Sequence, residues 1–188
     1  MTLYLVEDDR QERTKEEVSE ILERIATVAS KSQGELIEAL IGETEGRLFL
    51  IIKAIDRASL EQVLENAGLS WQLIKEMRLI GQDLATVRER KDKANYLVQW
   101  NLPPGLTMET YLQRKAEKTP LYAQVPEVSF ERTYVCEDLS KCLCFYDSPD
   151  EAAVKRAREV VGAPIAELPP YIYTTIAENP YPSMDAPP

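Results

Sequence analysis

The sequence contains no histidine among its 188 residues. Without an imidazole, the chain cannot build a Ser-His-Asp or Cys-His relay, or a zinc, nickel or haem site that depends on histidine ligands. Acid–base chemistry near neutral pH would fall to a perturbed carboxylate, lysine, cysteine or tyrosine. This absence makes enzyme activity uncertain and favours a non-catalytic protein.

Long apolar runs and an excess of positive charge are missing as well. No run approaches the roughly 20 apolar residues that a membrane helix requires. The start, MTLYLVEDDRQER, lacks the basic and then apolar pattern of a signal peptide, so we expect a cytoplasmic protein. With 22 basic and 32 acidic residues the formal net charge is −10. Such a surface repels phosphates, so neither nucleic acid nor a membrane is an expected partner.

The first half of the chain reads as strand, helix, hairpin, helix and strand. A β-rich run at residues 2–7 precedes Thr14 and Glu17, which have capping-box spacing before an apolar stripe at helical intervals. Two β-rich runs within residues 35–54 predict a hairpin. Ser59 and Gln62 predict a second capping box, and Gly68 predicts the end of that helix.

The second half repeats this order. Tyr4 aligns with Tyr96, and Thr107 is predicted to cap the next helix. After a second hairpin, Ser148 and Pro149 predict another helix start, with Ser148 as the cap. The pattern β-α-β-β-α-β in each half predicts an α+β protein of tandem ferredoxin-like repeats.

The predicted boundaries follow from these repeats. We expect repeat 1 over residues 1–81, a linker over 82–93, repeat 2 over 94–176 and a Pro-rich extended tail over 177–188. In RLFLIIKA, residues of both parities are apolar, so both faces of that strand should be buried. We therefore expect the two sheets to pack together as a pseudo-dimeric α+β barrel.

The second half resembles a bacterial family of small ferredoxin-like proteins that is labelled nickel-binding after a characterised member. The likeness extends over residues 94–173 and is carried by NYLVQWNLPPGLTMETY, by the SPDEAAV helix start, and by Arg132, Tyr134, Asp138, Cys144, Gly162 and Pro164. The resemblance implies a dimeric barrel, which agrees with the repeat pattern. It also implies a metal site that relies on histidine, and this chain offers no histidine to which such a ligand can be transferred.

The cysteines form one candidate site. Their spacing, C-x5-C-x-C, puts Cys142 and Cys144 on one face of a strand and Cys136 across a turn. With Asp138, the three thiolates could hold nickel or another soft metal. The alternative is a set of reduced cysteines in the core of a cytosolic protein, which we favour.

A second candidate is a small-molecule pocket among the strands. Arg132 and Tyr134 are expected to share a face with Phe130, and Glu38 occupies the position in repeat 1 that corresponds to Arg132. Glu38 and Arg132 are predicted to pair or to bind a polar ligand near the pseudo-twofold axis, or else to be solvated at the strand rims. The full predicted ligand-binding set is Glu38, Tyr96, Trp100, Phe130, Arg132, Tyr134 and Tyr146.

These patterns predict a non-catalytic small-ligand or regulatory binding protein, with no catalytic residue assigned and the cofactor unknown. Two alternatives stay open: a cofactor-free oxygenase of the α+β barrel type, and metal binding through cysteine and carboxylate. The tail at residues 177–188 is a candidate docking peptide for a protein partner. A homo-oligomer is also possible.

Overall fold

The computed structural model describes residues 1–9, 12–41, 47–90, 93–163 and 171–175. The chain divides into two compact units, with the first within residues 1–77 and the second within residues 78–176. The predicted tail at residues 177–188 lies outside the described residues. The part of the chain that is described contains no helix with the length and apolar character needed to cross a membrane.

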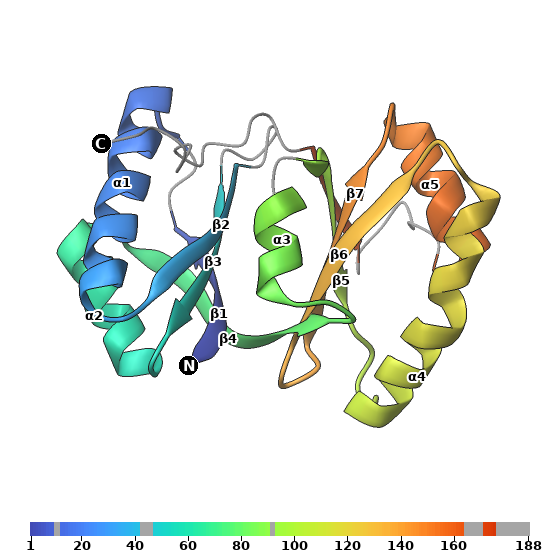
Figure 1. Ribbon diagram of the computed structural model, residues 1–188, viewed down its shortest axis with the longest axis horizontal. Helices are drawn as coiled ribbons and strands as arrows, with labels where there is room; N and C mark the ends of the chain where they lie inside the picture. Colours follow the sequence, from blue (N-terminus) through green and yellow to red (C-terminus); the bar gives the residue numbers. More distant parts are fainter. Residues whose placement is uncertain (10–11, 42–46, 91–92, 164–170, 176–188) are drawn as a thin grey trace. The chain divides into compact units, whose positions relative to one another are not determined.

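The first unit follows the predicted order of elements. Its elements are β1 (Thr2–Asp8), α1 (Lys15–Lys31), β2 (Glu35–Ile41), β3 (Leu48–Ala54), α2 (Arg57–Ala67) and β4 (Trp71–Ile80), whose last three residues belong to the second unit. The strands lie in the order β2-β3-β1-β4, and the neighbours pair antiparallel. Both helices lie on one face of these strands (Figure 1).

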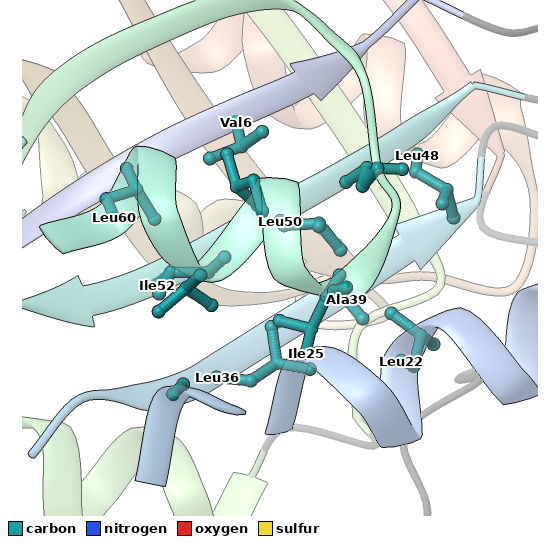
Figure 2. Packing of buried hydrophobic residues seen from close by; sticks show 14 of the residues in the cluster. Val6, Leu22, Ile25, Leu36, Ala39, Leu48, Leu50, Ile52 and Leu60 are labelled. Carbon is teal, nitrogen blue, oxygen red and sulfur yellow. The ribbon is translucent and has the colours of Figure 1, made fainter. Parts of the chain in front are cut away.

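The core of the first unit lies between this face and the two helices. Figure 2 shows Leu48, Leu50 and Ile52 of β3 beside Leu22 and Ile25 of α1. Alternate residues of a strand point to opposite faces, so Phe49 and Ile51 lie on the face away from this cluster, where they are also buried. The prediction that residues of both parities are buried in β3 is confirmed.

The second unit contains α3 (Leu84–Arg90), β5 (Tyr96–Asn101), α4 (Met108–Lys118), the 3₁₀ helix η2 (Thr119–Gln124), β6 (Ser129–Cys136), β7 (Lys141–Asp147), α5 (Glu151–Val160) and β8 (Tyr171–Thr175). The strand order is β6-β7-β5-β8, and the pairs are antiparallel. A mixed α+β fold with antiparallel strands is therefore confirmed.

The helix starts are partly as predicted. Thr14 and Glu17 form the capping box of α1, and Gly68 ends α2 with a φ of 76°. However, α2 is capped by Asp56 rather than Ser59, and α5 by Asp150 rather than Ser148. Each aspartate accepts a hydrogen bond from the backbone N–H three residues later, at 2.8 Å. An aspartate carboxylate therefore caps each helix, where a serine hydroxyl was predicted to do so.

The predicted linker, residues 82–93, contains the helix α3. Asp83 Oδ1 accepts from the backbone N–H of Thr86 at 2.9 Å, and Val87 is buried. The polar composition of this stretch concealed the helix, because a single buried side chain gives no detectable apolar period.

A β-bulge changes which residues of β6 share a face. The pairing with β7 shifts between Phe130 and Arg132, which leaves Glu131 without a partner in the register. Since one extra residue reverses the alternation, Phe130 lies on the helix-covered face and Arg132 and Tyr134 lie on the other. The expectation that these three residues share a face is wrong. A similar shift occurs in β2, between Leu36 and Glu38.

Candidate active site

The second unit contains a cavity of about 190 Å³. Its walls come from α4, η2, α5 and the strands β5 and β7. Among the described residues, the side chains in the walls that bear on chemistry are Trp100, Tyr111, Arg114, Lys115, Lys118, Tyr122, Cys142, Cys144 and Arg158. Four of them are basic, in a chain whose net charge is −10.

Helix α4 supplies most of the positive charge because of its residue spacing. Tyr111, Lys115 and Lys118 follow at intervals of four and three, which places them along one side of a helix. Thr107 Oγ1 caps the start of α4 by accepting a hydrogen bond from the backbone N–H of Thr110, with an N···O distance of 3.2 Å. The cap therefore fixes the residue at which the helix begins.

Cys144 lies at the centre of the polar contacts in the cavity wall. Its Sγ lies 3.7 Å from Arg158 Nη1, 3.8 Å from Lys115 Nζ and 3.5 Å from Thr133 Oγ1. Two cations and a hydroxyl donor therefore surround the sulfur atom of Cys144, a residue that is 1% exposed. Donors of this kind stabilise a thiolate more than a thiol.

Cys142, two residues earlier in β7, shifts the pKa of Cys144. A hydrogen bond from Cys142, together with the charges of Lys115 and Arg158, lowers the pKa of Cys144 well below 9 and outweighs burial. The same hydrogen bond and burial raise the pKa of Cys142. Of the two thiols, Cys144 is therefore the one that loses its proton more readily.

Tyrosine hydroxyls form the second polar feature. The oxygens of Tyr122 and Tyr146 lie 2.7 Å apart, and Arg158 Nη1 lies 3.1 Å from the Tyr146 oxygen. Burial, and next the charge of Cys144, raise the pKa of Tyr122 to about 12. Burial also raises the pKa of Tyr146 well above 10. Both hydroxyls are therefore protonated at neutral pH and can donate hydrogen bonds.

Aromatic rings hold the cations in place. Phe130 stacks on Tyr122 with ring centroids 4.9 Å apart and lies 4.4 Å from Lys115 Nζ. The guanidinium of Arg158 lies 5.7 Å from the centre of the Trp100 ring. These cation–π contacts stabilise positive charge in a mainly apolar wall.

The predicted ligand-binding residues divide into two groups. Tyr96, Trp100, Phe130 and Tyr146 belong to the apolar cluster beside the cavity, and Trp100 lines it. Arg132 and Tyr134 lie on the opposite face of the sheet, where both contact the ring of Phe145. Glu38 lies in β2 of the first unit, so its pairing with Arg132 stays a prediction.

The predicted metal ligands do not converge. Val135 and Thr133 pair with Cys142 and Cys144, so Cys136 points to the opposite face of the sheet. Asp138 accepts hydrogen bonds from Ser140 in the turn, at 3.0 and 2.6 Å. Within the described ranges, no cluster of three or more potential ligands is found that could hold a metal ion. These residues therefore do not fit a nickel site of three or four ligands.

Several residues of the cavity were not predicted, namely Tyr111, Arg114, Lys115, Lys118, Tyr122 and Arg158, and neither was Thr133, which contacts Cys144. One signal was readable, because Arg158 interrupts the apolar stripe of α5 formed by Val154, Ala157 and Val161. A charge at a core position of a helix indicates either a buried ion pair or a site.

The cavity lies in the part of the chain that matches a protein-family model. Residues 96–170 match the model of the SCO4226-like nickel-responsive proteins. This confirms the resemblance predicted for the second half. No curated protein matches the sequence.

Three solved structures share the fold over nearly the whole chain. One is a proposed monooxygenase from Lactobacillus acidophilus NCFM, with 9% identity, a TM-score of 0.51 and 95% of each chain covered. Another is a proposed chlorite dismutase, with 11% identity, a TM-score of 0.54 and coverage of 96% of this chain and 97% of that one. The third is a mutant chlorite dismutase from Candidatus Nitrospira defluvii, with 9% identity, a TM-score of 0.50 and coverage of 93% of this chain and 90% of that one.

These comparisons correct one expectation. The three proteins are named for catalysis, and this contradicts the non-catalytic binding protein that we expected from the sequence. Because identities near 10% show the fold alone, the chemistry has to be argued from the cavity.

Proposed function

We propose that the second unit is the catalytic part of an enzyme that oxygenates a small anionic aromatic compound. The observation that carries this proposal is the convergence of Arg114, Lys115, Lys118 and Arg158 on a mainly apolar cavity. Apolar walls with a few placed polar groups are typical of small-molecule sites. Clustered cations in an acidic protein favour a negatively charged substrate.

The positive charges would also activate the substrate. A hydroxylated aromatic becomes a good electron donor when it loses a proton, and nearby cations lower the pKa of such a phenol. Lys115 and Arg158 are placed to stabilise the phenolate, while the protonated Tyr122 can donate a hydrogen bond to it. The tryptophan ring of Trp100 offers a surface for stacking.

The reaction balances with molecular oxygen as the only other reactant. A hydroquinone and dioxygen give a hydroxyquinone and one water molecule. One oxygen atom of dioxygen replaces a ring hydrogen, and the other leaves in the water. The aromatic substrate supplies the electrons for both.

The test uses gentisate, an anionic hydroquinone, in an oxygen electrode. We expect one molecule of dioxygen to be consumed for each hydroxyquinone formed. With labelled dioxygen, the product should carry one labelled oxygen atom. Lys115→Met should lower kcat/KM about tenfold or more, since it removes one charge near the phenolate. Lys155→Met, on an exposed part of α5, is the control for loss of one positive charge. Formation of unlabelled quinone and hydrogen peroxide would contradict oxygenation.

The tandem arrangement belongs to the same proposal. Both units show the order β-α-β-β-α-β, and the similar structures span more than nine-tenths of the chain. We propose that they are two ferredoxin-like repeats that pack as an α+β barrel. A small-angle scattering profile of the full chain that fits two separated units would contradict this arrangement.

A further inference from the structure

The geometry around Cys144 points to a second chemical property of the cavity. We propose that Cys144 is a nucleophilic thiolate and that the basic residues of α4 select electrophiles that carry a negative charge. This inference shares the cavity with the proposed oxygenation but needs neither dioxygen nor an aromatic substrate.

The contacts of the sulfur support the nucleophile. Cys144 Sγ meets Arg158 and Lys115, one from each helix above the sheet, as well as the hydroxyl of Thr133. Arg158 is 2% exposed and is held by the hydroxyl of Tyr146, so the guanidinium is fixed rather than swinging into solvent. A thiolate that is oriented by fixed cations and opens on a cavity has the features of a reactive cysteine.

The position of Cys142 beside Cys144 favours ionisation of one of the two thiols rather than both. Both sulfurs lie on the same face of β7 and both line the cavity. Two neighbouring thiolates would repel each other, so a negative charge on Cys144 disfavours a second one on Cys142. The lowered pKa of Cys144 agrees with this division.

The charge of the walls supports the choice of electrophile. Arg114 and Lys118 also line the cavity, in addition to the two cations that touch the sulfur. Clefts lined by charge of one sign raise the local concentration of oppositely charged molecules by about 10-fold to 1,000-fold. An anionic electrophile is thus expected to react faster than a neutral one of similar size.

Iodoacetate and iodoacetamide make this comparison directly, because they differ in charge and share one reaction. The sulfur attacks the carbon that bears iodine, a C–S bond forms, and iodide leaves with the bonding electron pair. The full-length protein is treated with each reagent at neutral pH, and peptide mass spectrometry identifies the modified cysteine. Glutathione provides the reference rate ratio for an unselective thiol.

We expect carboxymethylation at Cys144 in the folded protein, with a ratio of iodoacetate to iodoacetamide rates about tenfold above that of glutathione. Lys118→Met should bring the ratio down, and Lys155→Met should leave it unchanged. Cys144→Ser should abolish the reaction, whereas Cys136→Ser should not, because Cys136 lies on the other face of the sheet.

Three results would overturn the proposal. They are modification at Cys142 in place of Cys144, a rate ratio equal to that of glutathione, and modification only after unfolding in urea. Peptide mapping of the wild-type protein settles the site even if Cys144→Ser does not fold. Selective alkylation of Cys144 without oxygen uptake would support this inference and contradict the proposed oxygenation. Oxygen uptake without selective alkylation would support the oxygenation and contradict this inference.

Discussion

The hydroxyl oxygens of Tyr122 and Tyr146 lie 2.7 Å apart in the second unit, and Arg158 donates to the Tyr146 oxygen at 3.1 Å. Tyr146 is therefore the residue that connects the 3₁₀ helix η2 to the charged helix α5. The two tyrosines make the same hydrogen bond to each other, and Tyr146 also accepts the 3.1 Å hydrogen bond from the Arg158 guanidinium.

Removing each hydroxyl separately measures that difference. Tyr122→Phe deletes one neutral hydrogen bond and should lower the free energy of unfolding by about 1 kcal/mol. Tyr146→Phe deletes the same bond and also the charge-assisted bond from Arg158, so the loss should reach about 2–4 kcal/mol. Urea denaturation followed by circular dichroism gives both values. Equal losses in the two variants would show that the contact with Arg158 adds nothing to stability.

Two bidentate ion pairs in the second unit differ in burial. Arg90 meets both carboxylate oxygens of Glu131 at 2.8 Å, and the Glu131 side chain is fully buried. Arg78 meets Glu137 at 3.0 and 2.9 Å, with both side chains more than a third exposed. Glu131→Gln should cost about 1–3 kcal/mol, because the buried carboxyl loses charge-assisted hydrogen bonds although Arg90 is half exposed. Glu137→Gln should cost less than about 1 kcal/mol.

The buried carboxylate of Glu131 also predicts a dependence on pH. Burial by itself would raise the pKa of Glu131, but hydrogen bonds from Arg90 and Ser129 outweigh it and hold the pKa below its usual value of 4.5. A carboxylate with a lowered folded-state pKa stabilises the protein fully above pH 4.5, and this contribution is lost as the pH falls through the folded-state pKa. The difference in unfolding free energy between wild type and Glu131→Gln should therefore shrink below about pH 4.5. A constant difference down to pH 3 would contradict this.

Gly34 and Gly68 in the first unit disfavour a side chain for different reasons, steric contact at Gly34 and backbone conformation at Gly68. A Cβ at Gly34 would lie 2.7 Å from the carbonyl oxygen of Lys53 and 3.2 Å from that of Ala29, whereas one at Gly68 meets nothing within 4 Å. Gly68→Ala suffers only from its φ of 76°, at about 1–2 kcal/mol. Gly34→Ala must displace backbone and should cost more, about 3 kcal/mol. Thermal unfolding of both variants tests the order, and a larger loss for Gly68→Ala would contradict it.

Trp100 can report on the cavity because it lines the wall. In a Trp71→Phe background, gentisate should change the fluorescence of Trp100 and bind about tenfold more tightly than gentisamide, which lacks the carboxylate. Lys115→Met should weaken gentisate and leave gentisamide nearly unchanged, because only the anion gains from the ammonium group. Equal affinities for the two compounds would contradict an anion-selective cavity.

The local pattern of the sequence was sufficient for most elements. Apolar residues at strand and helix periods predicted the order of elements in both units, and Thr14 and Gly68 were read correctly as helix boundaries. The spacing of Cys142 and Cys144 also placed them on one face of a strand. These features depend on residues a few positions apart, whose geometry the backbone fixes locally.

The site depended on long-range structure. The bulge at Glu131 moved Arg132 and Tyr134 to the opposite face from Phe130, and alternation alone gave no sign of it. The cavity combines residues of two helices, a 3₁₀ helix and two strands, and Lys115 and Arg158 meet at Cys144 although 43 positions separate them in the printed sequence. The sequence by itself determined which segments bury their apolar faces, because hydrophobic spacing is local. Only the tertiary structure decided which charges converge on one sulfur atom, because that depends on how the helices pack on the sheet.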